Sequence, residues 1–146
     1  MEKRILSQKV LGKSYESYEK MGMAVHCMLL NKNYRAYPII TLEMWTFYAV
    51  VHNQISFLFS SDGKPIAYIT WAYMMDGTVD RLLNDPQFLL HPSEWDEEGN
   101  PWVLDFCCTP GLGSEAIKRF LKLKPWKGDS IKWLSRKKKI FTKIVN

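Results

Sequence analysis

The chain has 146 residues, of which 47% are hydrophobic and 14% aromatic, and its formal net charge is +5. This composition excludes a largely disordered chain and suits a single domain over residues 1–146 with one core. No apolar run approaches the roughly 20 residues of a membrane-spanning helix, and the first residues lack the apolar stretch of a signal peptide. We therefore expect a cytoplasmic protein without a transmembrane segment.

Two regions of the first half are expected to be helical. Residues 14–31 carry apolar side chains at steps of three and four, and Pro38 prevents the helix from continuing easily. Thr41 could cap a second helix that runs to about His52. Both helices are rich in large apolar residues, so we expect them to pack on a sheet.

The clearest local pattern is a hairpin. Residues 54–60 and 66–73 are rich in β-branched and aromatic side chains, which is typical of strands. Residues 61–65 between them carry the Asp, Gly and Pro of a tight turn. The sequence therefore predicts two antiparallel strands joined by this turn.

The second half is expected to add two helices and three strands. In chain order these are a helix at 78–84, a polar surface loop with some apolar anchors at 87–101, a strand at 102–108, a helix from a Ser114 cap to residue 123, and strand candidates at 131–134 and 140–145. The whole order indicates an α+β fold with a mostly antiparallel central sheet flanked by helices. The strand–turn–helix at 105–113 would place N–H groups where they can hold an anion or a carbonyl oxygen.

The cysteines and the charge distribution limit the partners. Cys27, Cys107 and Cys108 are odd in number, lack metal-ligand spacing and are best interpreted as small core residues, the adjacent pair pointing to opposite faces of a strand. We expect no metal and no bound cofactor. Bases dominate from 118 to 143, which fits either a solvated tail or a docking surface for an acidic protein. Without a recognised binding motif, we expect no nucleic acid partner.

Three segments form a pattern through their order and spacing. They are Met21-Gly22 through Tyr34-Arg35-Ala36-Tyr37-Pro38-Ile39, then Asn53-Gln54 with Pro65-Ile66-Ala67-Tyr68 and Thr70-Trp71-Ala72, then Trp102-Val103-Leu104-Asp105-Phe106 with Pro110-Gly111. Together they resemble the toxin-activating lysine acyltransferases, which activate haemolysin-type RTX toxins. The resemblance covers about residues 20–135. It implies a GNAT-like fold and acyl transfer from an acyl carrier protein to a toxin lysine.

The resemblance also implies a site, with departures from the family pattern. Asp105 lies where the family has its essential Asp, and Arg35 keeps the family identity. Tyr34 stands where the family has its essential His, and Asn31 and Trp45 replace a Ser and an Asn. A tyrosine with an ordinary pKa of about 10 is a poor base at neutral pH, whereas a histidine near 6.5 is a good one. Tyr34 could still donate a hydrogen bond to a carbonyl or an oxyanion.

Another group could supply the missing base. His52, near the end of the second helix, is the better substitute, whereas His26 is rotated off the face of Tyr34 and His91 lies in the polar loop. For Asp105 itself the sequence leaves two roles open, a catalytic group or a buried structural hydrogen-bond acceptor. The candidate catalytic residues are therefore Asp105, Tyr34, Arg35 and His52.

Three functions follow from the resemblance and its departures. The first is an acyltransferase-like protein that, with a partner subunit, joins a glycosylated siderophore to a microcin peptide through its C-terminal serine. The second is fatty-acyl transfer from an acyl carrier protein to a lysine of an RTX toxin. The third is a catalytically silent scaffold. Each requires a peptide or protein toxin as substrate or partner, and a second subunit or a homo-oligomer is expected.

Overall fold

One six-stranded sheet organises the computed structural model, which describes residues 5–7, 16–134 and 140–144. Its strands lie in chain order: β1 (Leu6–Ser7), β2 (Ile55–Phe59), β3 (Pro65–Met74), β4 (Asn100–Cys108), β5 (Ser130–Leu134) and β6 (Ile140–Ile144). Every neighbouring pair is antiparallel except β4 and β5, which are parallel. The predicted α+β class with a mostly antiparallel sheet is confirmed, and so is the hairpin formed by β2 and β3.

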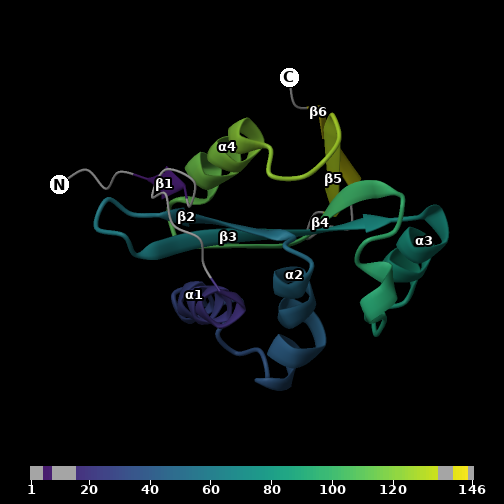
Figure 1. The fold of residues 1–146 in the computed structure, drawn as a ribbon, viewed down its shortest axis with the longest axis horizontal. Helices are drawn as coiled ribbons and strands as arrows, with labels where there is room; N and C mark the ends of the chain where they lie inside the picture. Colours follow the sequence, from purple (N-terminus) through teal and green to yellow (C-terminus); the bar gives the residue numbers. More distant parts are fainter. Residues whose placement is uncertain (1–4, 8–15, 135–139, 145–146) are drawn as a thin grey trace.

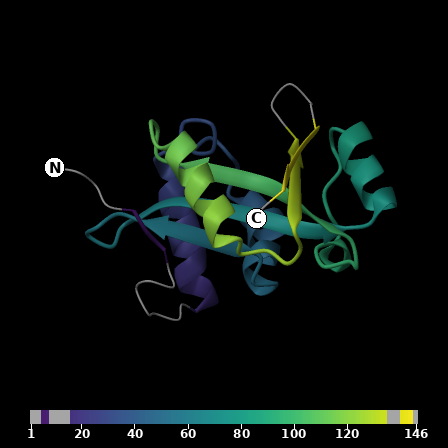
Figure 2. The same cartoon turned by 90° about the horizontal axis from the view of Figure 1, so that it is seen from above.

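Helices cover both faces of this sheet. They are α1 (Ser17–Leu29), the π-helix η1 (Leu42–Thr46) that continues into α2 (Phe47–Val51), α3 (Asp76–Asn84), the short 3₁₀-helix η2 (Pro92–Glu94) and α4 (Gly113–Leu123). Figure 1 shows α1 and α2 on one face, α4 on the other and α3 beyond one end of the sheet. Figure 2 shows α4 lying across the strands. None of the helices in the described part of the chain is long and apolar enough to cross a membrane.

Thr41 is the N-cap position of η1, and the helix predicted from there to about His52 is present, whereas the predicted cap at Ser114 is wrong. Thr41 has helical backbone angles and makes no side-chain cap bond, and η1 begins after it as a π-helix. Helix α4 begins at Gly113 with Leu112 as its N-cap, so Ser114 lies inside the first turn. The helix at 78–84 begins two residues earlier than expected, at Asp76. Residues 14, 15 and 145 of the predicted elements lie outside the described residues.

The apolar anchors predicted for the loop at 87–101 are present, and a charged residue is buried with them. Leu90 and Glu94 are buried, and Trp95 is fully buried. Glu94 pairs with Arg81 of α3 and accepts the backbone N–H of His91, so its charge is compensated. A buried charge needs such partners, and these come from residues that the local sequence does not reveal. Strand β4 also begins inside this stretch, at Asn100.

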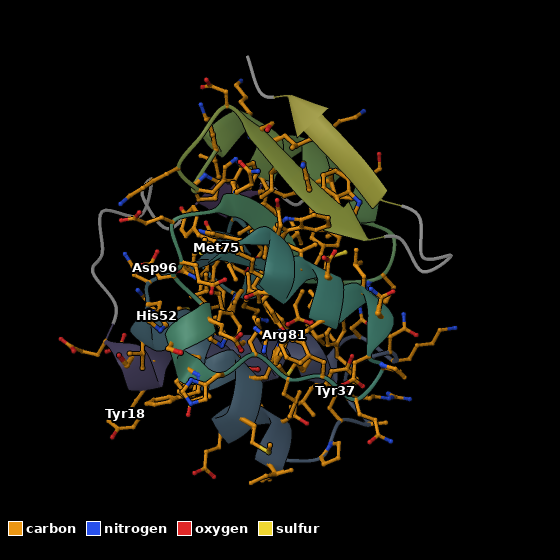
Figure 3. The ribbon with its side chains drawn as sticks, turned by 90° about the vertical axis from the view of Figure 1, so that its right-hand side faces the viewer. Tyr18, Tyr37, His52, Met75, Arg81 and Asp96 are labelled. Atoms are coloured by element: carbon orange, nitrogen blue, oxygen red, sulfur yellow. The ribbon has the colours of Figure 1, made fainter. Side chains whose placement is uncertain are left out.

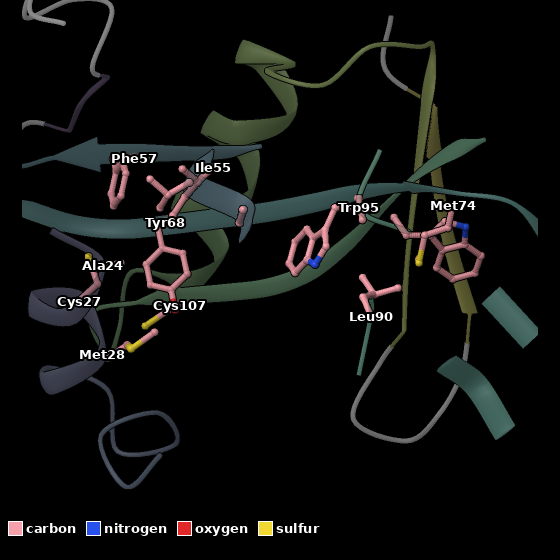
Figure 4. Close-up of a cluster of buried hydrophobic side chains, with 14 of the residues drawn as sticks. Ala24, Cys27, Met28, Ile55, Phe57, Tyr68, Met74, Leu90, Trp95 and Cys107 are labelled. Atoms are coloured by element: carbon pink, nitrogen blue, oxygen red, sulfur yellow. The ribbon is translucent and has the colours of Figure 1, made fainter. Parts of the chain in front are cut away.

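The sheet separates two apolar cores. One lies under α1 and α2, where Figure 4 shows Tyr68, Cys107, Cys27 and Met28 packed together. The other lies under α4 and contains Cys108. Cys107 and Cys108 therefore point to opposite faces, and all three cysteines are buried and free, as predicted.

An irregularity in β4 changes which face its side chains reach. Thr70 pairs with Asp105, but the next residue of β3, Trp71, pairs with Val103, so Leu104 is an extra residue in β4. Such a bulge shifts the alternation of side chains by one position. Val103 packs in the core under α4, whereas Leu104 packs against the core under α1 and α2.

Candidate functional site

Asp105 lies beside the bulge, opposite Thr70, and like Cys107 two residues later it faces the side that α1 and α2 cover. Two side chains of that layer donate hydrogen bonds to the carboxylate. The Trp45 indole N–H lies 2.7 Å from Oδ2, and the Tyr34 hydroxyl lies 3.4 Å from Oδ1. The Asp105 backbone N–H donates to Thr70 Oγ1 at 3.0 Å, which fixes the strand at the bulge. The structure therefore brings Asp105 and Tyr34 together, as the sequence predicts.

Tyr34 is held as a hydrogen-bond donor. Its hydroxyl also reaches the Phe106 carbonyl oxygen, at 3.2 Å, so its single proton has two acceptors within reach. Burial, and then the charge of Asp105, raise the pKa of Tyr34 well above its ordinary value. The hydroxyl therefore stays protonated at neutral pH, and Tyr34 cannot act as a resting base. This agrees with the argument from its ordinary pKa.

The carboxyl group of Asp105 is desolvated but bonded. Burial raises its pKa, and the hydrogen bonds from Trp45, Tyr34 and Thr70 oppose that rise without cancelling it. A carboxylate with a raised pKa is a stronger base than one in water, and it remains a better general base than the protonated phenol beside it. The arrangement can accept a proton at Asp105 and donate a hydrogen bond from Tyr34.

The other two predicted residues are placed differently, because Arg35 borders a hollow together with Tyr34 whereas His52 lies at the end of α2. Arg35 is exposed on the connection after α1. His52 is the C-cap of α2, seven residues after Trp45, and the hydrogen bonds that Asp105 accepts come from other side chains. Figure 3 shows His52 and Tyr37 on opposite sides of the molecule, and Tyr37 packs 5.1 Å from Tyr34 between ring centroids. His52 therefore does not take the place of an imidazole at Asp105.

The remaining histidines also lie elsewhere. His26 is exposed on α1, and His91 is exposed, with its ring accepting from the Ser93 backbone N–H as the cap of η2. Within the described ranges, no three of the His, Cys, Asp and Glu side chains lie close enough together to hold a metal ion.

The start of α4 does not lie next to Asp105 and Tyr34. Asp105 lies three residues before the end of β4, about 10 Å along the strand at about 3.3 Å per residue. The expected placement of Asp105 at the mouth of the strand-to-helix turn is therefore wrong. Instead, the connection after α1 meets the edge of β4, where Asn31 donates to the Cys108 carbonyl at 3.0 Å and Tyr34 reaches that of Phe106.

Tyr34 and Arg35 border a hollow of about 200 Å³ at the connection after α1, and two further hollows each border one member of the pair. Strand β5 pairs with β4 only at Trp102 and Val103, and where the two strands part lies a hollow of about 320 Å³, here called the strand-gap hollow. It is lined by Tyr34, Ile69, Val103, Leu104, Phe106, Ile117, Phe120, Leu121, Trp126, Ile131 and Trp133. A second one, of about 280 Å³, here called the helix-side hollow, is lined by Tyr37, Ile40, Thr41, Met44, Trp45, Leu89 and Asp105. Tyr34 thus also borders the strand-gap hollow, and Asp105 borders the helix-side hollow.

Two residues of the site were not recognised as functional from the sequence. Trp45 was noted only as a departure from a family pattern, yet it makes the shortest hydrogen bond to Asp105. Its spacing after Tyr34 carries no signal, because η1 is a π-helix whose pitch differs from the expected α-helix. Tyr37 borders the helix-side hollow and its ring packs against that of Tyr34 at a tilt of 50°, and its place three residues later is the only hint in the sequence.

Comparison with known proteins identifies a family. The family model described as HlyC, RTX toxin acyltransferase family, matches residues 13–145. None of the curated proteins matches this chain. The matched range contains Asp105, Tyr34 and Trp45 and almost all of the described fold.

Proposed function

Since the chain belongs to the RTX toxin acyltransferase family, we propose that it transfers an acyl group to a bacterial peptide or protein toxin with Asp105 as the general base. The observation that supports this most is the position of the Asp105 carboxylate. It borders the helix-side hollow with a raised pKa, and beside it is the permanently protonated hydroxyl of Tyr34, which borders the strand-gap hollow. A base and a hydrogen-bond donor on either side of one reacting carbon are what acyl transfer requires.

The reaction uses the two groups in turn. The acceptor hydroxyl oxygen attacks the acyl carbonyl carbon while its proton passes to Asp105. The carbonyl oxygen becomes an oxyanion that accepts a hydrogen bond from Tyr34, which gives up its bond to the Phe106 carbonyl. The oxyanion then collapses, the bond from carbon to the leaving group breaks, and Asp105 returns the proton to that group. Asp105 and Tyr34 therefore divide the roles that one histidine and one carboxylate share in the family pattern.

The acceptor that suits this pair is a hydroxyl group. A carboxylate can assist a neutral hydroxyl as it attacks, whereas a lysine ammonium with an ordinary pKa of about 10.4 must first lose a proton that a carboxylate holds poorly. We therefore propose the finer function that the sequence suggested, in which the protein, with a partner subunit, joins a glycosylated siderophore to the C-terminal serine of a microcin peptide.

The test is intact-mass analysis of the candidate peptide after incubation with wild-type protein and with Asp105→Asn. We expect the wild type to add the mass of the acyl group and Asp105→Asn to add none, a fall of at least about a thousandfold in rate, as for loss of a catalytic base. Unchanged modification by the variant would remove the proposed role of Asp105. A product on lysine rather than serine would replace the finer proposal with the second candidate.

That second candidate is fatty-acyl transfer to a toxin lysine. The strand-gap hollow favours it, because aliphatic and aromatic side chains line most of its wall. Beside it, α4 exposes Lys118, Arg119 and Lys122, which suit the surface of an acidic acyl carrier protein. The two candidates differ in the donor, so octanoyl-loaded acyl carrier protein distinguishes them by the mass of the product. Absence of product with either donor, and with the partner subunit present, would leave the scaffold hypothesis.

A further inference from the structure

The helix-side hollow has an apolar rim that stays exposed to solvent. Tyr37, Ile40 and Met44 contribute one side of it and Leu89 the other, and these side chains are 47%, 52%, 44% and 48% exposed. The rim residues come from two segments far apart in sequence, the region of η1 and the stretch before η2. Apolar side chains gathered in one exposed place mark interaction sites more often than single ones do.

The floor of this hollow is the proposed base. Asp105 lines it, and Trp45, which bonds the carboxylate, lines it too. Apart from Asp105, every side chain that lines the hollow is uncharged. A phosphate or another strongly charged group would therefore find no cationic partner there. The chemistry of the wall suits an apolar side chain, and the position of the carboxylate suits the nucleophile next to it.

The two hollows separate the two substrates. Tyr34, the oxyanion donor, borders the strand-gap hollow, whereas Asp105, which takes the proton of the acceptor, opens into the helix-side hollow. Because the acceptor's proton must reach Asp105, the acceptor enters from the helix side.

We propose that the helix-side hollow is the docking site of the acceptor polypeptide, and that it selects an acceptor residue flanked by large apolar side chains. The proposal rests on acyl transfer with Asp105 as base. Met44 and Leu89 hold the flanking side chain from opposite sides, and they determine which position of the toxin is modified. Selection then depends on the neighbours of the acceptor residue as well as on its hydroxyl.

The test uses fluorescein-labelled peptides of twelve residues that end in a single C-terminal serine, preceded either by leucines or by glutamines. Binding is measured by fluorescence anisotropy, and transfer to hydroxylamine is measured separately as a reaction that needs no docked peptide. The variants Met44→Gln and Leu89→Gln, made singly and in combination, remove apolar side chains from the rim. The matched controls are Met75→Gln and Leu123→Gln, since both residues are exposed and neither lines this hollow.

We expect wild-type protein to bind the leucine peptide at least about tenfold more tightly than the glutamine peptide, the size of effect that burial of one apolar side chain gives. The double variant loses this preference, and both controls keep it. Equal binding of the two peptides by wild type, or an equal loss in the controls, overturns the docking site. Apolar-selective binding without transfer to any acceptor would instead refute the proposed acyl transfer and leave the docking site standing.

Discussion

The two faces of the sheet are built on different plans. The face under α4 is covered by an amphipathic helix, with Ala116 and Phe120 turned inward and Lys118 and Lys122 exposed. The face under α1 and α2 surrounds a carboxylate, and its helices also leave large apolar side chains exposed, such as Leu29 and Met44. The α4 face follows the ordinary rule that apolar side chains lie inside and polar ones outside. The α1–α2 face departs from this rule twice, because it buries a charged group and exposes apolar side chains.

The departures indicate where the chemistry lies. A buried carboxylate costs stability unless it is bonded, and exposed apolar side chains contribute little to the fold of this chain. Both occur together around the helix-side hollow, within reach of Asp105. We infer that the α4 face mainly holds the fold and that the α1–α2 face carries the reaction.

The largest expected effect tests the structural role of the α4 face. Leu58 is 1% exposed and packs in the core under α4, so Leu58→Ala should lower the free energy of unfolding by about 2–5 kcal/mol. Tyr18→Ala, at an 86% exposed position of α1, should change it by less than about 0.5 kcal/mol. Urea denaturation measures both. If Leu58→Ala lowered the free energy of unfolding only slightly, the α4 face would not be the part of the molecule that mainly holds the fold.

The sequence was sufficient where the structure is local. Residues 61–65 carry their turn chemistry within a few positions, so the β2–β3 hairpin could be predicted without knowledge of any partner. The opposite directions of Cys107 and Cys108 follow from the alternation of any strand. Asp105 and Tyr34 came from the family pattern, and the structure places them in contact.

What could not be predicted depends on partners distant in the chain. The bulge at Leu104 appears only in the register against β3, and it determines which faces Leu104 and Val103 reach next to Asp105. Trp45, which bonds Asp105, lies in the π-helical turn η1. The spacing rules for amphipathic α-helices do not predict where the side chains of such a turn point. The complete burial of Trp95 within its polar loop and the parallel pair of β4 and β5 could not be predicted for the same reason, since the surrounding sequence is polar or short.

The next largest expected effect comes from removing either of the two side chains, Trp45 and Tyr34, that donate hydrogen bonds to Asp105. Trp45→Phe and Tyr34→Phe each remove one hydrogen bond to a charged acceptor, worth about 1.5–3 kcal/mol, so each should lower kcat/KM by roughly 10–100-fold below the pKa of Asp105. Both losses raise that pKa further. Because the base must be ionised, the acidic limb of the pH–rate profile should move to higher pH.

The plateau of the same profile separates the two roles. At high pH Asp105 is ionised in both variants, so Trp45→Phe should recover most of its kcat. Tyr34→Phe should stay low, because the oxyanion has also lost its donor. Full recovery of both variants would assign Tyr34 to positioning Asp105 alone, and it would weaken the view that this face supplies both catalytic groups.

The smallest expected effect concerns stability rather than rate. In Asp105→Asn the amide oxygen can still accept from Trp45, while its NH₂ group donates to the Tyr34 hydroxyl, which in turn donates to the Phe106 carbonyl. The variant keeps these bonds without a buried charge. Since the folded-state pKa of Asp105 is raised, the wild type should lose stability relative to the variant as pH rises from the unfolded value of about 3.9 through the folded value.

Thermal or urea unfolding of both proteins between pH 4 and 7 measures this difference, which grows by about 1.4 kcal/mol for each unit by which the pKa is raised. The variant should be the more stable protein at neutral pH although it has lost its activity. If the wild type instead gains stability relative to the variant with rising pH, the bonds from Trp45 and Tyr34 outweigh burial. The carboxylate would then be a structural acceptor, and the α1–α2 face would follow the same plan as the α4 face.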